Sequence, residues 1–432
     1  MINSIILAAG KGTRMKSSKP KVIHKVLGTE MVNLVLRSMN NLGASNNLVV
    51  VGYKKEDVIS SLYPELEHSI VEQHKQLGTG DAIKSCKEYL QDQDGITFVV
   101  SGDTPIITDT TYKNLLDYHK ENNFDMTVLT TDINDPFGYG RIIREGDRLE
   151  KIVEQKDATS EEKKVLEINS GIYIFDNKKL FELIDFLDNN NAQEEYYLTD
   201  MVKIFIDNNL SVGAYKTLDH KEIIGVNDLV TLSKVNHILK KRINNQHMLN
   251  GVQLVDKHNT YIGINVVIEE DVLIYPGNQI YGQSTIRSGT VLKPNNTIVN
   301  SEVGHDCEIG PMCYLRKNTK IGDNCRFGNF VEAKNTKIKS NTTAAHLTYL
   351  GDAEIGSNVN LGCGVITCNY DGVNKHKTTI GDNVFVGSNT NLIAPISIDD
   401  NVFIAAGATV SDDVSKDKFI IQRADTKIKD KK

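Results

Sequence analysis

Glycines and cations follow one another near the start of the chain, in the run Leu7-Ala8-Ala9-Gly10-Lys11-Gly12-Thr13-Arg14-Met15. Glycines let a backbone approach a phosphate closely, and Lys11 and Arg14 would bring positive charge to it. The spacing matches neither the G-x-x-x-x-G-K-[ST] phosphate loop nor the G-x-G-x-x-G dinucleotide fingerprint. The run therefore indicates either a phosphate-binding loop of another kind or a simple tight turn, and Pro20-Lys21 offers a further cation beside it.

An acid, Asp103, follows the apolar run 96–100. A carboxylate at the end of a strand, close to a phosphate loop, is well placed to hold a divalent cation. The alternative is that Asp103 caps a helix, although Asp109 could serve that purpose instead. A third glycine-bearing stretch, from Gln73 to Gly80, also leads into a helical pattern.

These residues need a sheet to position them, and residues 1 to about 225 alternate between strand and helix patterns. The expected strands are Ile5–Ala8, Leu48–Val51 and Ile96–Val100, and the expected helices are Met31–Leu42, about 54–62 and about 79–90. This order predicts an α/β domain with a doubly wound, mostly parallel sheet, whose ligands bind at the carboxyl ends of the strands.

The second half of the chain has a different period. An aliphatic or aromatic residue returns every six positions, with one slip of a single residue, in three series: Ile262, Ile268, Ile274, Ile280, Ile286, Leu292, Ile298; Val303, Ile309, Leu315, Ile321, Phe327; and Ile380, Val386, Leu392, Ile398, Ile404, Val410. A period of six is typical of a parallel β-helix, in which each hexad forms one side of a triangular coil of about 18 residues. The span predicts roughly eight coils.

Small residues recur at the corners of the expected coils, among them Cys307, Cys313 and Cys325. Cys307 and Cys325 are 18 residues apart, so they could stack, but we expect free thiols because the chain lacks secretory signals.

The ladder of hexads fails between about Lys339 and Thr379, and polar residues gather there. His346 and Tyr349 are followed by Asn369, Tyr370 and Lys375. A lone histidine is more often structural, but a base of pKa near 7 is also what acetyl transfer to an amine requires. Arg316, Glu332 and Lys334 would lie within reach on preceding coils, and Glu332 could orient His346.

Composition limits the remaining possibilities. The 432 residues carry a net charge of −7, which argues against a broad nucleic-acid surface. The chain has six cysteines without a C-x-x-C pair, its amino terminus is unlike a signal peptide, and it has no apolar window long enough to span a membrane. These features predict a cytoplasmic protein. The expected domains are residues 1–226, a linker helix at 227–250 and the β-helix at 251–432.

The motifs taken together resemble a known family. The glycine-rich start, Pro20-Lys21, residues 76–80 and Gly102-Asp103 are similar to sugar-1-phosphate nucleotidyltransferases. With residues 138–141, Glu154, 167–171 and 225–228, the first half resembles the bacterial enzymes that combine N-acetylglucosamine-1-phosphate uridyltransferase and glucosamine-1-phosphate acetyltransferase activities. The resemblance extends over nearly the whole chain and implies that the β-helix is left-handed and built of hexapeptide repeats.

The resemblance implies a site for uridylyl transfer from UTP to N-acetylglucosamine 1-phosphate. Arg14 and Lys21 would be catalytic, by neutralising charge, and Asp103 and Asn227 would ligate Mg²⁺. Substrate-binding residues would be Leu7, Ala8, Ala9, Gly10, Lys21, Gln73, Gly78, Thr79, Gly140, Glu154, Asn169 and Asn227.

The second half resembles the acetyltransferase part of the same family. His346 would be the general base, glucosamine 1-phosphate would contact Arg316, Lys334, Tyr349, Asn360 and Lys375, and acetyl-CoA would contact Asn369, Tyr370, Ser388, Ala406 and Arg423. Cys363 stands where the family usually has alanine, a small-for-small change. The resemblance also implies a homotrimer with acetyl sites shared between subunits.

Two other interpretations stay open from the sequence. The β-helix could only assemble or regulate a one-site nucleotidyltransferase, as in ADP-glucose pyrophosphorylases, or it could be a pure interaction scaffold. Binding of coenzyme A would separate the scaffold from the enzyme.

Overall fold

The computed structural model describes residues 1–424 and 426–431. The chain forms two compact units, Met1–Ile238 and Leu239–Lys432.

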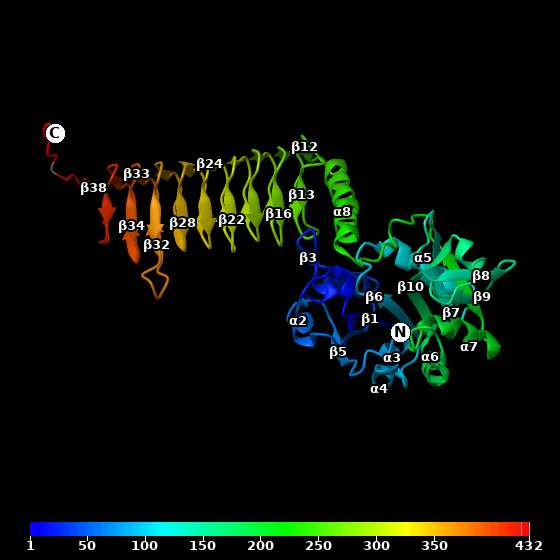
Figure 1. Cartoon of the computed structure of the whole chain (residues 1–432). Helices are drawn as coiled ribbons and strands as arrows, with labels where there is room; N and C mark the ends of the chain where they lie inside the picture. The colour runs from blue at the N-terminus through cyan, green and yellow to red at the C-terminus, as the bar shows by residue number, and fades with distance from the viewer. Residues whose placement is uncertain (425, 432) are drawn as a thin grey trace. The chain divides into compact units, whose positions relative to one another are not determined.

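The first unit is built on a mixed sheet in the order β11-β7-β10-β6-β1-β4-β5, with β8 and β9 attached to β10 as a hairpin (Figure 1). Strand β10 is antiparallel to β6 and β7, whereas β1 is parallel to both β4 and β6. The strands are β1 (Ile2–Leu7), β4 (Asn46–Val51), β5 (Ser69–Glu72), β6 (Ile96–Ser101), β7 (Met126–Asp132), β8 (Arg141–Glu145), β9 (Arg148–Val153), β10 (Glu167–Asp176) and β11 (Val212–Lys216), and β2 (Lys25–Val26) pairs with β3 (Thr29–Glu30).

Helices cover both faces of this sheet. They are α1 (Met31–Asn41), α2 (Lys55–Ile59), α3 (Thr79–Lys84), α4 (Lys87–Leu90), α5 (Asp109–Glu121), α6 (Asn177–Leu183) and α7 (Met201–Asp207). Alternate strand residues belong to two separate cores: Ile5 packs with residues of α3, α6 and α7, and Ile6 with residues of α1, α2 and α5. The prediction of a doubly wound α/β domain is confirmed.

Two local predictions were wrong. The helix expected over 79–90 is two helices, because the Cys86 amide bonds Ile83 three residues back and tightens the chain into a turn. Helical spacing continues across this turn, so the pattern could not reveal it. Helix α5 is capped by Thr108, whose side chain accepts from the Thr111 amide at 3.1 Å, and not by Asp109.

The long helix expected after residue 227 is present as α8 (Leu229–Leu249), and the boundary between the two units falls inside it. None of the helices within the described residues combines the length and the apolar character that crossing a bilayer requires.

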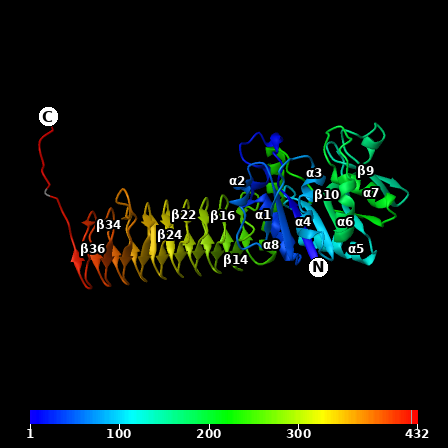
Figure 2. The same ribbon diagram turned by 90° about the horizontal axis from the view of Figure 1, so that it is seen from below.

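The second unit is a parallel β-helix of stacked coils, as Figures 1 and 2 show. Its three sheets have ten, nine and eight strands, which agrees with the estimate of about eight coils. We name each sheet after its first strand. The β12 sheet contains β12 (Gln253–Leu254), β15 (Leu273–Ile274), β18 (Val291–Leu292), β21 (Glu308–Ile309), β24 (Arg326–Asn329), β27 (Thr343–His346), β30 (Asn360–Leu361), β33 (Phe385–Val386), β36 (Phe403–Ile404) and β38 (Phe419–Ile420).

The other two sheets complete the triangle. The β13 sheet contains β13 (Tyr261–Ile262), β16 (Gln279–Tyr281), β19 (Thr297–Val299), β22 (Tyr314–Arg316), β25 (Glu332–Lys334), β28 (Tyr349–Gly351), β31 (Ile366–Cys368), β34 (Asn391–Ile393) and β37 (Thr409–Val410). The β14 sheet contains β14 (Val267–Ile268), β17 (Thr285–Ile286), β20 (Glu302–Val303), β23 (Lys320–Ile321), β26 (Lys337–Ile338), β29 (Ala353–Ile355), β32 (Thr378–Ile380) and β35 (Ile396–Ile398).

The predicted ladder residues form the core of this unit, and strand partners lie 17 or 18 residues apart through most of it. The slip after Ile298 is a coil of 17 residues, because Ile286 pairs with Val303. Cys307 and Cys325 lie on neighbouring coils as buried free thiols.

The predicted failure of the ladder from Lys339 to Thr379 was wrong in extent. Coils continue through this region, and the inward positions are Ala344, Leu350, Ile355, Leu361 and Thr367, each at most 2% exposed. The pattern was missed because two of these residues are not large aliphatics and one step is five residues long. The real interruption lies between Thr367 and Ile380.

That interruption is an inserted loop at the corner between the β13 and β14 sheets, and it projects from the stacked coils (Figure 1). An antiparallel bridge joins Tyr370 to Lys375 across it. The Asp371 carboxylate accepts from the backbone amides of Val373 and Asn374 and lies 2.7 Å from the His376 ring. The His376 contact, followed by those amides, lowers the pKa of Asp371 to about 2.

Candidate active sites

Two oxygen acceptors of the first unit meet at one ammonium group. Lys21 Nζ contacts a carboxylate oxygen of Asp103 and lies 3.3 Å from Oδ1 of Asn227. Arg14 donates to the same Asn227 oxygen at 2.8 Å. A carboxylate and an amide that already converge on a cation form a donor set that suits Mg²⁺, which usually takes few protein ligands.

Strand order explains why this cluster forms. Strands β1 and β6 are parallel neighbours with Leu7 opposite Ser101, so their carboxyl ends share one edge of the sheet. Asp103 is only 8% exposed, and its second oxygen accepts from the Ser101 hydroxyl at 2.7 Å. Among the described residues no helix begins at Asp103, so the capping interpretation is wrong.

A cavity of about 390 Å³ opens above the same edge. The predicted residues that line it are Leu7, Ala9, Gly10, Lys21, Gln73, Gly78, Thr79 and Asp103. Ala8 does not line it, because strand alternation turns its side chain into the core, where it is 1% exposed.

The wall formed by Gln73, Gly78 and Thr79 depends on a glycine. Gly78 has φ +111°, and a Cβ there would lie 2.7 Å from the carbonyl oxygen of Tyr196. Gln73 donates from Nε2 to the Gly78 carbonyl at 3.1 Å. The Thr79 hydroxyl accepts from the Leu198 amide at 3.0 Å, which joins the wall to the segment opposite.

The three residues predicted to hold a sugar also lie together. A Cβ on Gly140 would be 3.3 Å from a Glu154 oxygen and 3.5 Å from Asn169 Cβ. The Asn169 amide side chain donates to the Tyr173 hydroxyl at 2.6 Å, which fixes its orientation. Burial, followed by the charge of Asp200, raises the pKa of Glu154.

In the second unit, four residues that the sequence analysis named share the outer face of the β13 sheet. Arg316 stacks on Lys334, and Glu332 stacks on Tyr349, on successive strands. Arg316 donates to Glu332 through Nε and Nη2 at 2.9 and 2.7 Å. The structure thus pairs Glu332 with Arg316, and among the described contacts none joins Glu332 to His346, so the idea that Glu332 orients His346 has no support within one chain.

Lys375 brings the inserted loop to this face. Contact with the Lys375 ammonium group, and then burial, lowers the pKa of Lys334. Asp352 balances these charges: its oxygens accept from Asn335 at 2.7 Å and Asn369 at 2.5 Å, and Lys334 Nζ lies 4.0 Å away. Sequence reasoning missed Asp352, although its position one coil after the predicted Lys334 and that residue's neighbour Asn335 could have signalled it.

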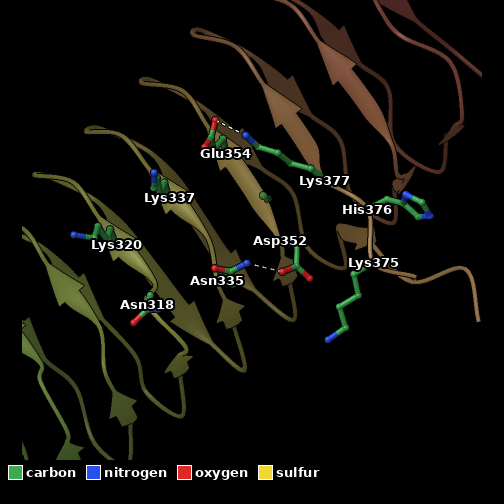
Figure 3. Close-up of a pocket in the computed structure, with 10 residues that line it drawn as sticks. Asn318, Lys320, Asn335, Lys337, Asp352, Glu354, Lys375, His376 and Lys377 are labelled. Carbon is green, nitrogen blue, oxygen red and sulfur yellow. Dashed lines mark hydrogen bonds and ion pairs between the residues drawn. The ribbon is translucent and has the colours of Figure 1, made fainter. Parts of the chain in front are cut away.

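A groove of about 500 Å³ runs along the β14 sheet beside Asp352 (Figure 3). Lys320, Lys337 and Glu354 line it from successive strands, and Lys377 pairs with Glu354 at 2.7 Å. In Figure 3 the Lys375 side chain extends from the inserted loop away from Glu354 and Lys377. The groove therefore adjoins the cluster of Lys334, Asp352 and Lys375 on the side of the inserted loop.

The predicted base lies at the opposite edge of the β13 face. Strand pairing gives a column of residues along the corner between the β12 and β13 sheets: His346, Cys363, Ser388 and Ala406. Hydrogen bonds between backbones follow this column, from Gly364 to His346 at 3.4 Å and from Gly407 to Ser388 at 2.8 Å. Arg423 donates from Nη1 to the Ala406 carbonyl at 2.7 Å.

Two predicted residues stand apart from these groups. Asn360 lies on the β12 sheet, between Thr343 and Phe385. Tyr370 lies in the inserted loop, 60% exposed, and its hydroxyl donates to the Gly372 carbonyl at 2.6 Å. One chain alone therefore does not bring every predicted acetyl-site residue together.

Comparison with known proteins identifies both halves. The model of the Nucleotidyl transferase family matches residues 3–221, and that of the Bacterial transferase hexapeptide (six repeats) family matches residues 300–333 and 377–412. The hexapeptide match agrees with the predicted left-handed parallel β-helix.

Similar proteins cover the whole length. A protein named "Bifunctional protein GlmU" from Clostridioides difficile is 48% identical, over 99% of this chain and 96% of its own. Proteins of the same name from Streptococcus agalactiae and a Geobacillus species are 47% and 45% identical, over 97% and 98% of this chain and 95% of their own. A solved structure titled as a putative glucose-1-phosphate thymidylyltransferase from Bacillus anthracis covers 55% of this chain and 95% of its own, with 20% identity and a TM-score of 0.46, too distant to add to the argument.

Proposed function

The chain belongs to the family of bifunctional GlmU proteins, and we propose that its two units divide the family's two reactions between the two sets of residues described above. The protein is a bifunctional enzyme that makes UDP-N-acetylglucosamine. It transfers an acetyl group from acetyl-CoA to glucosamine 1-phosphate and a uridylyl group from UTP to N-acetylglucosamine 1-phosphate.

We assign uridylyl transfer to the cavity at the carboxyl ends of β1 and β6. An oxygen of the sugar phosphate attacks the α-phosphorus of UTP, and the bond to pyrophosphate breaks. Lys21 and Arg14 counter the negative charge, and the protein need not supply a nucleophile. Gly140, Glu154 and Asn169 hold the sugar.

Asp103 and Asn227 would hold Mg²⁺, which supplies charge neutralisation to phosphoryl oxygens when bound. The observation that supports this proposal is the convergence of both oxygens on the Lys21 ammonium group. Within the described residues no cluster of three or more His, Cys, Asp or Glu side chains forms a metal site, so the ion would depend on these two ligands and on phosphates.

We assign acetyl transfer to the face of the β13 sheet and its two corners. The amine nitrogen of glucosamine 1-phosphate attacks the thioester carbonyl, the carbon–sulfur bond breaks, His346 takes the amine proton, and coenzyme A leaves as the thiolate. Arg316, Lys334, Tyr349 and Lys375 bind the sugar phosphate, because cations suit its phosphate group.

Assembly, compartment and domain limits are also proposals. A homotrimer would let Asn360 of one copy complete the β13 face of another, since Asn360 lies on a different sheet from Lys334. Six free thiols support the cytoplasm as the compartment. We keep residues 1–226, 227–250 and 251–432 as functional divisions.

Two substitutions test the division. We expect His346→Ala to abolish thiol release from acetyl-CoA while pyrophosphate release from UTP stays nearly intact, and Asp103→Ala to do the reverse. His258→Ala, an exposed histidine at the same kind of corner, and Asp109→Ala, an exposed carboxylate of the first unit, are matched controls. Loss of both activities in either test variant, with the fold intact, would refute the assignment.

A further inference from the structure

Three phenylalanine rings form a stack on the outer face of the β12 sheet. The ring centroids of Phe385 and Phe403 are 4.5 Å apart with planes inclined by 9°, and those of Phe403 and Phe419 are 5.4 Å apart at 25°. Exposure rises along the stack, from 39% through 43% to 60%. We call these three residues the phenylalanine stack.

The stack differs from the four outward positions that precede it on the same sheet. These are Glu308, Arg326, Thr343 and Asn360, all polar, whereas the apolar Leu273 and Val291 stand earlier in the column. Asn360 is paired directly with Phe385, so the apolar surface begins immediately after a residue assigned to the acetyl site. Contiguous exposed aromatic surface beside a polar column marks a binding surface better than scattered apolar residues do.

The corner beside the stack carries other residues assigned to the acetyl site. Ser388 and Ala406 each follow a stack residue by three positions, at the turn from the β12 to the β13 sheet. Arg423 reaches the Ala406 carbonyl at 2.7 Å, four residues after Phe419. Strand β27 ends at the proposed base His346, and strand β38 begins with Phe419. The two strands are four steps apart on the β12 sheet, about 19 Å at the usual strand spacing. The extended pantetheine–diphosphate arm of coenzyme A spans such a distance.

The charge of the segment that follows the stack in the sequence also fits this ligand. Residues 423–432 contain five lysines or arginines and two acids. Among the described residues β38 is the last strand of its sheet, so within them no further strand covers the side of Phe419 that faces away from Phe403. An open aromatic ring that is followed in the sequence by excess positive charge suits an adenine ring attached to phosphates.

We infer that the phenylalanine stack binds the adenosine part of acetyl-CoA, with the adenine against Phe419 and the phosphates towards Arg423. This inference rests on the proposed acetyl transfer and extends it to recognition of the cosubstrate. Ring contact with a base depends on the aromatic face and not on apolar character alone, so leucine cannot replace phenylalanine here, whereas tyrosine can.

The test compares acetyl-CoA with S-acetyl-N-acetylcysteamine, a thioester that lacks adenosine. In Phe419→Leu we expect KM for acetyl-CoA to rise about tenfold, as loss of one stacked base predicts. KM for the short thioester and for glucosamine 1-phosphate should stay unchanged, and Phe419→Tyr should restore the wild-type KM. Leu273→Ala, at the far end of the same sheet, is the control for changes of its outer face.

Calorimetric titration with coenzyme A keeps this inference separate from the proposed function, because it needs no turnover. Binding about tenfold weaker in Phe419→Leu, with Phe419→Tyr like the wild type, is the expected result. Three results for Phe419→Leu would overturn the inference. They are an unchanged affinity for coenzyme A, an equal loss of activity with both thioesters, or a changed oligomeric state together with loss of activity with both thioesters. The last result would assign the stack to contact between copies of the chain. Failure of the proposed function would instead appear as no acetyl transfer by the wild type.

Discussion

Replacing Asp352 by asparagine should separate substrate positioning from chemistry in the acetyl site. The Asp352 carboxylate joins Asn369 of the inserted loop to Lys334 on the coil before it. The predicted base His346 is not among the residues that contact Asp352. We therefore expect its loss to displace binding groups without removing the proton acceptor.

The size of the effect follows from the two amide contacts. The side chain is only 17% exposed, so solvent screens these interactions little. Hydrogen bonds to a charged group contribute about 1.5–3 kcal/mol. Asparagine keeps one side-chain oxygen. That oxygen can still accept one of the two hydrogen bonds, but as an uncharged acceptor. A loss of about 1.4 kcal/mol, or about tenfold in affinity, is the resulting expectation.

The assay is thiol release at varied concentrations of each substrate. In Asp352→Asn, KM for glucosamine 1-phosphate and for acetyl-CoA should each rise about tenfold with little change in kcat. Pyrophosphate release should be unaffected. Asp306→Asn is the matched control, since Asp306 occupies the same left-handed corner conformation (φ +52° against +50°) and is exposed.

Stability gives an independent reading of the same contacts. Burial acts to raise the pKa of Asp352, but the amides of Asn335 and Asn369 outweigh it and the pKa is lowered. The stabilisation is therefore present above the unfolded pKa of about 3.9 and is lost as pH falls through the lower folded value. In urea unfolding at pH 7 the wild type should have a larger free energy of unfolding than Asp352→Asn. This difference should shrink in acid. Unchanged KM values with the stability difference present would refute the positioning role.

Two further predictions concern the first unit. Gly78→Ala should abolish uridylyl transfer and spare acetyl transfer, because the new Cβ would meet the Tyr196 backbone at 2.7 Å; Gly43→Ala, where φ is +81° but nothing lies within 4 Å, should retain activity. Asp200→Asn should stabilise the protein at neutral pH. Burial, followed by Asp188, raises the pKa of Asp200 to about 6, so the wild type loses stability as pH rises from about 4 to 6. The melting temperatures of the wild type and the variant should therefore coincide at pH 4, and the variant should melt at the higher temperature above pH 6. A variant that is less stable than the wild type at pH 7 would contradict this.

The fold was largely predictable because both halves depend on period. Alternating strand and helix patterns specify a doubly wound sheet, and a six-residue repeat specifies a β-helix. Local exceptions depend on geometry that a period does not encode. The turn at Cys86 between α3 and α4 and the cap at Thr108 each rest on a single hydrogen bond.

The residues of the proposed sites could be named from the sequence only where a motif carries the chemistry. Lys21, Asp103 and Asn227 belong to recognisable motifs, and the structure brings them together. Asp352 belongs to no motif, because its role comes from partners 17 residues away on either side in the sequence, Asn335 and Asn369. In a β-helix such relations become visible only when the number of residues in each coil is known.

Thr367 shows why the ladder loses its aliphatic residue where the insertion begins. Elsewhere the amide after an inward residue bonds the carbonyl of its partner on the next coil, as Gly263 bonds Ile280. Here the Thr367 carbonyl accepts instead from Asn369 at 2.9 Å, which turns the chain out of the sheet. The buried Gly351 amide would then lack an acceptor, and the Thr367 hydroxyl supplies one at 2.8 Å. An unpaired buried amide costs about 1–3 kcal/mol, so a β-branched residue with a hydroxyl is favoured over valine at this position. The break in the hydrophobic period is therefore a requirement of the loop that carries Lys375 to the proposed acetyl site.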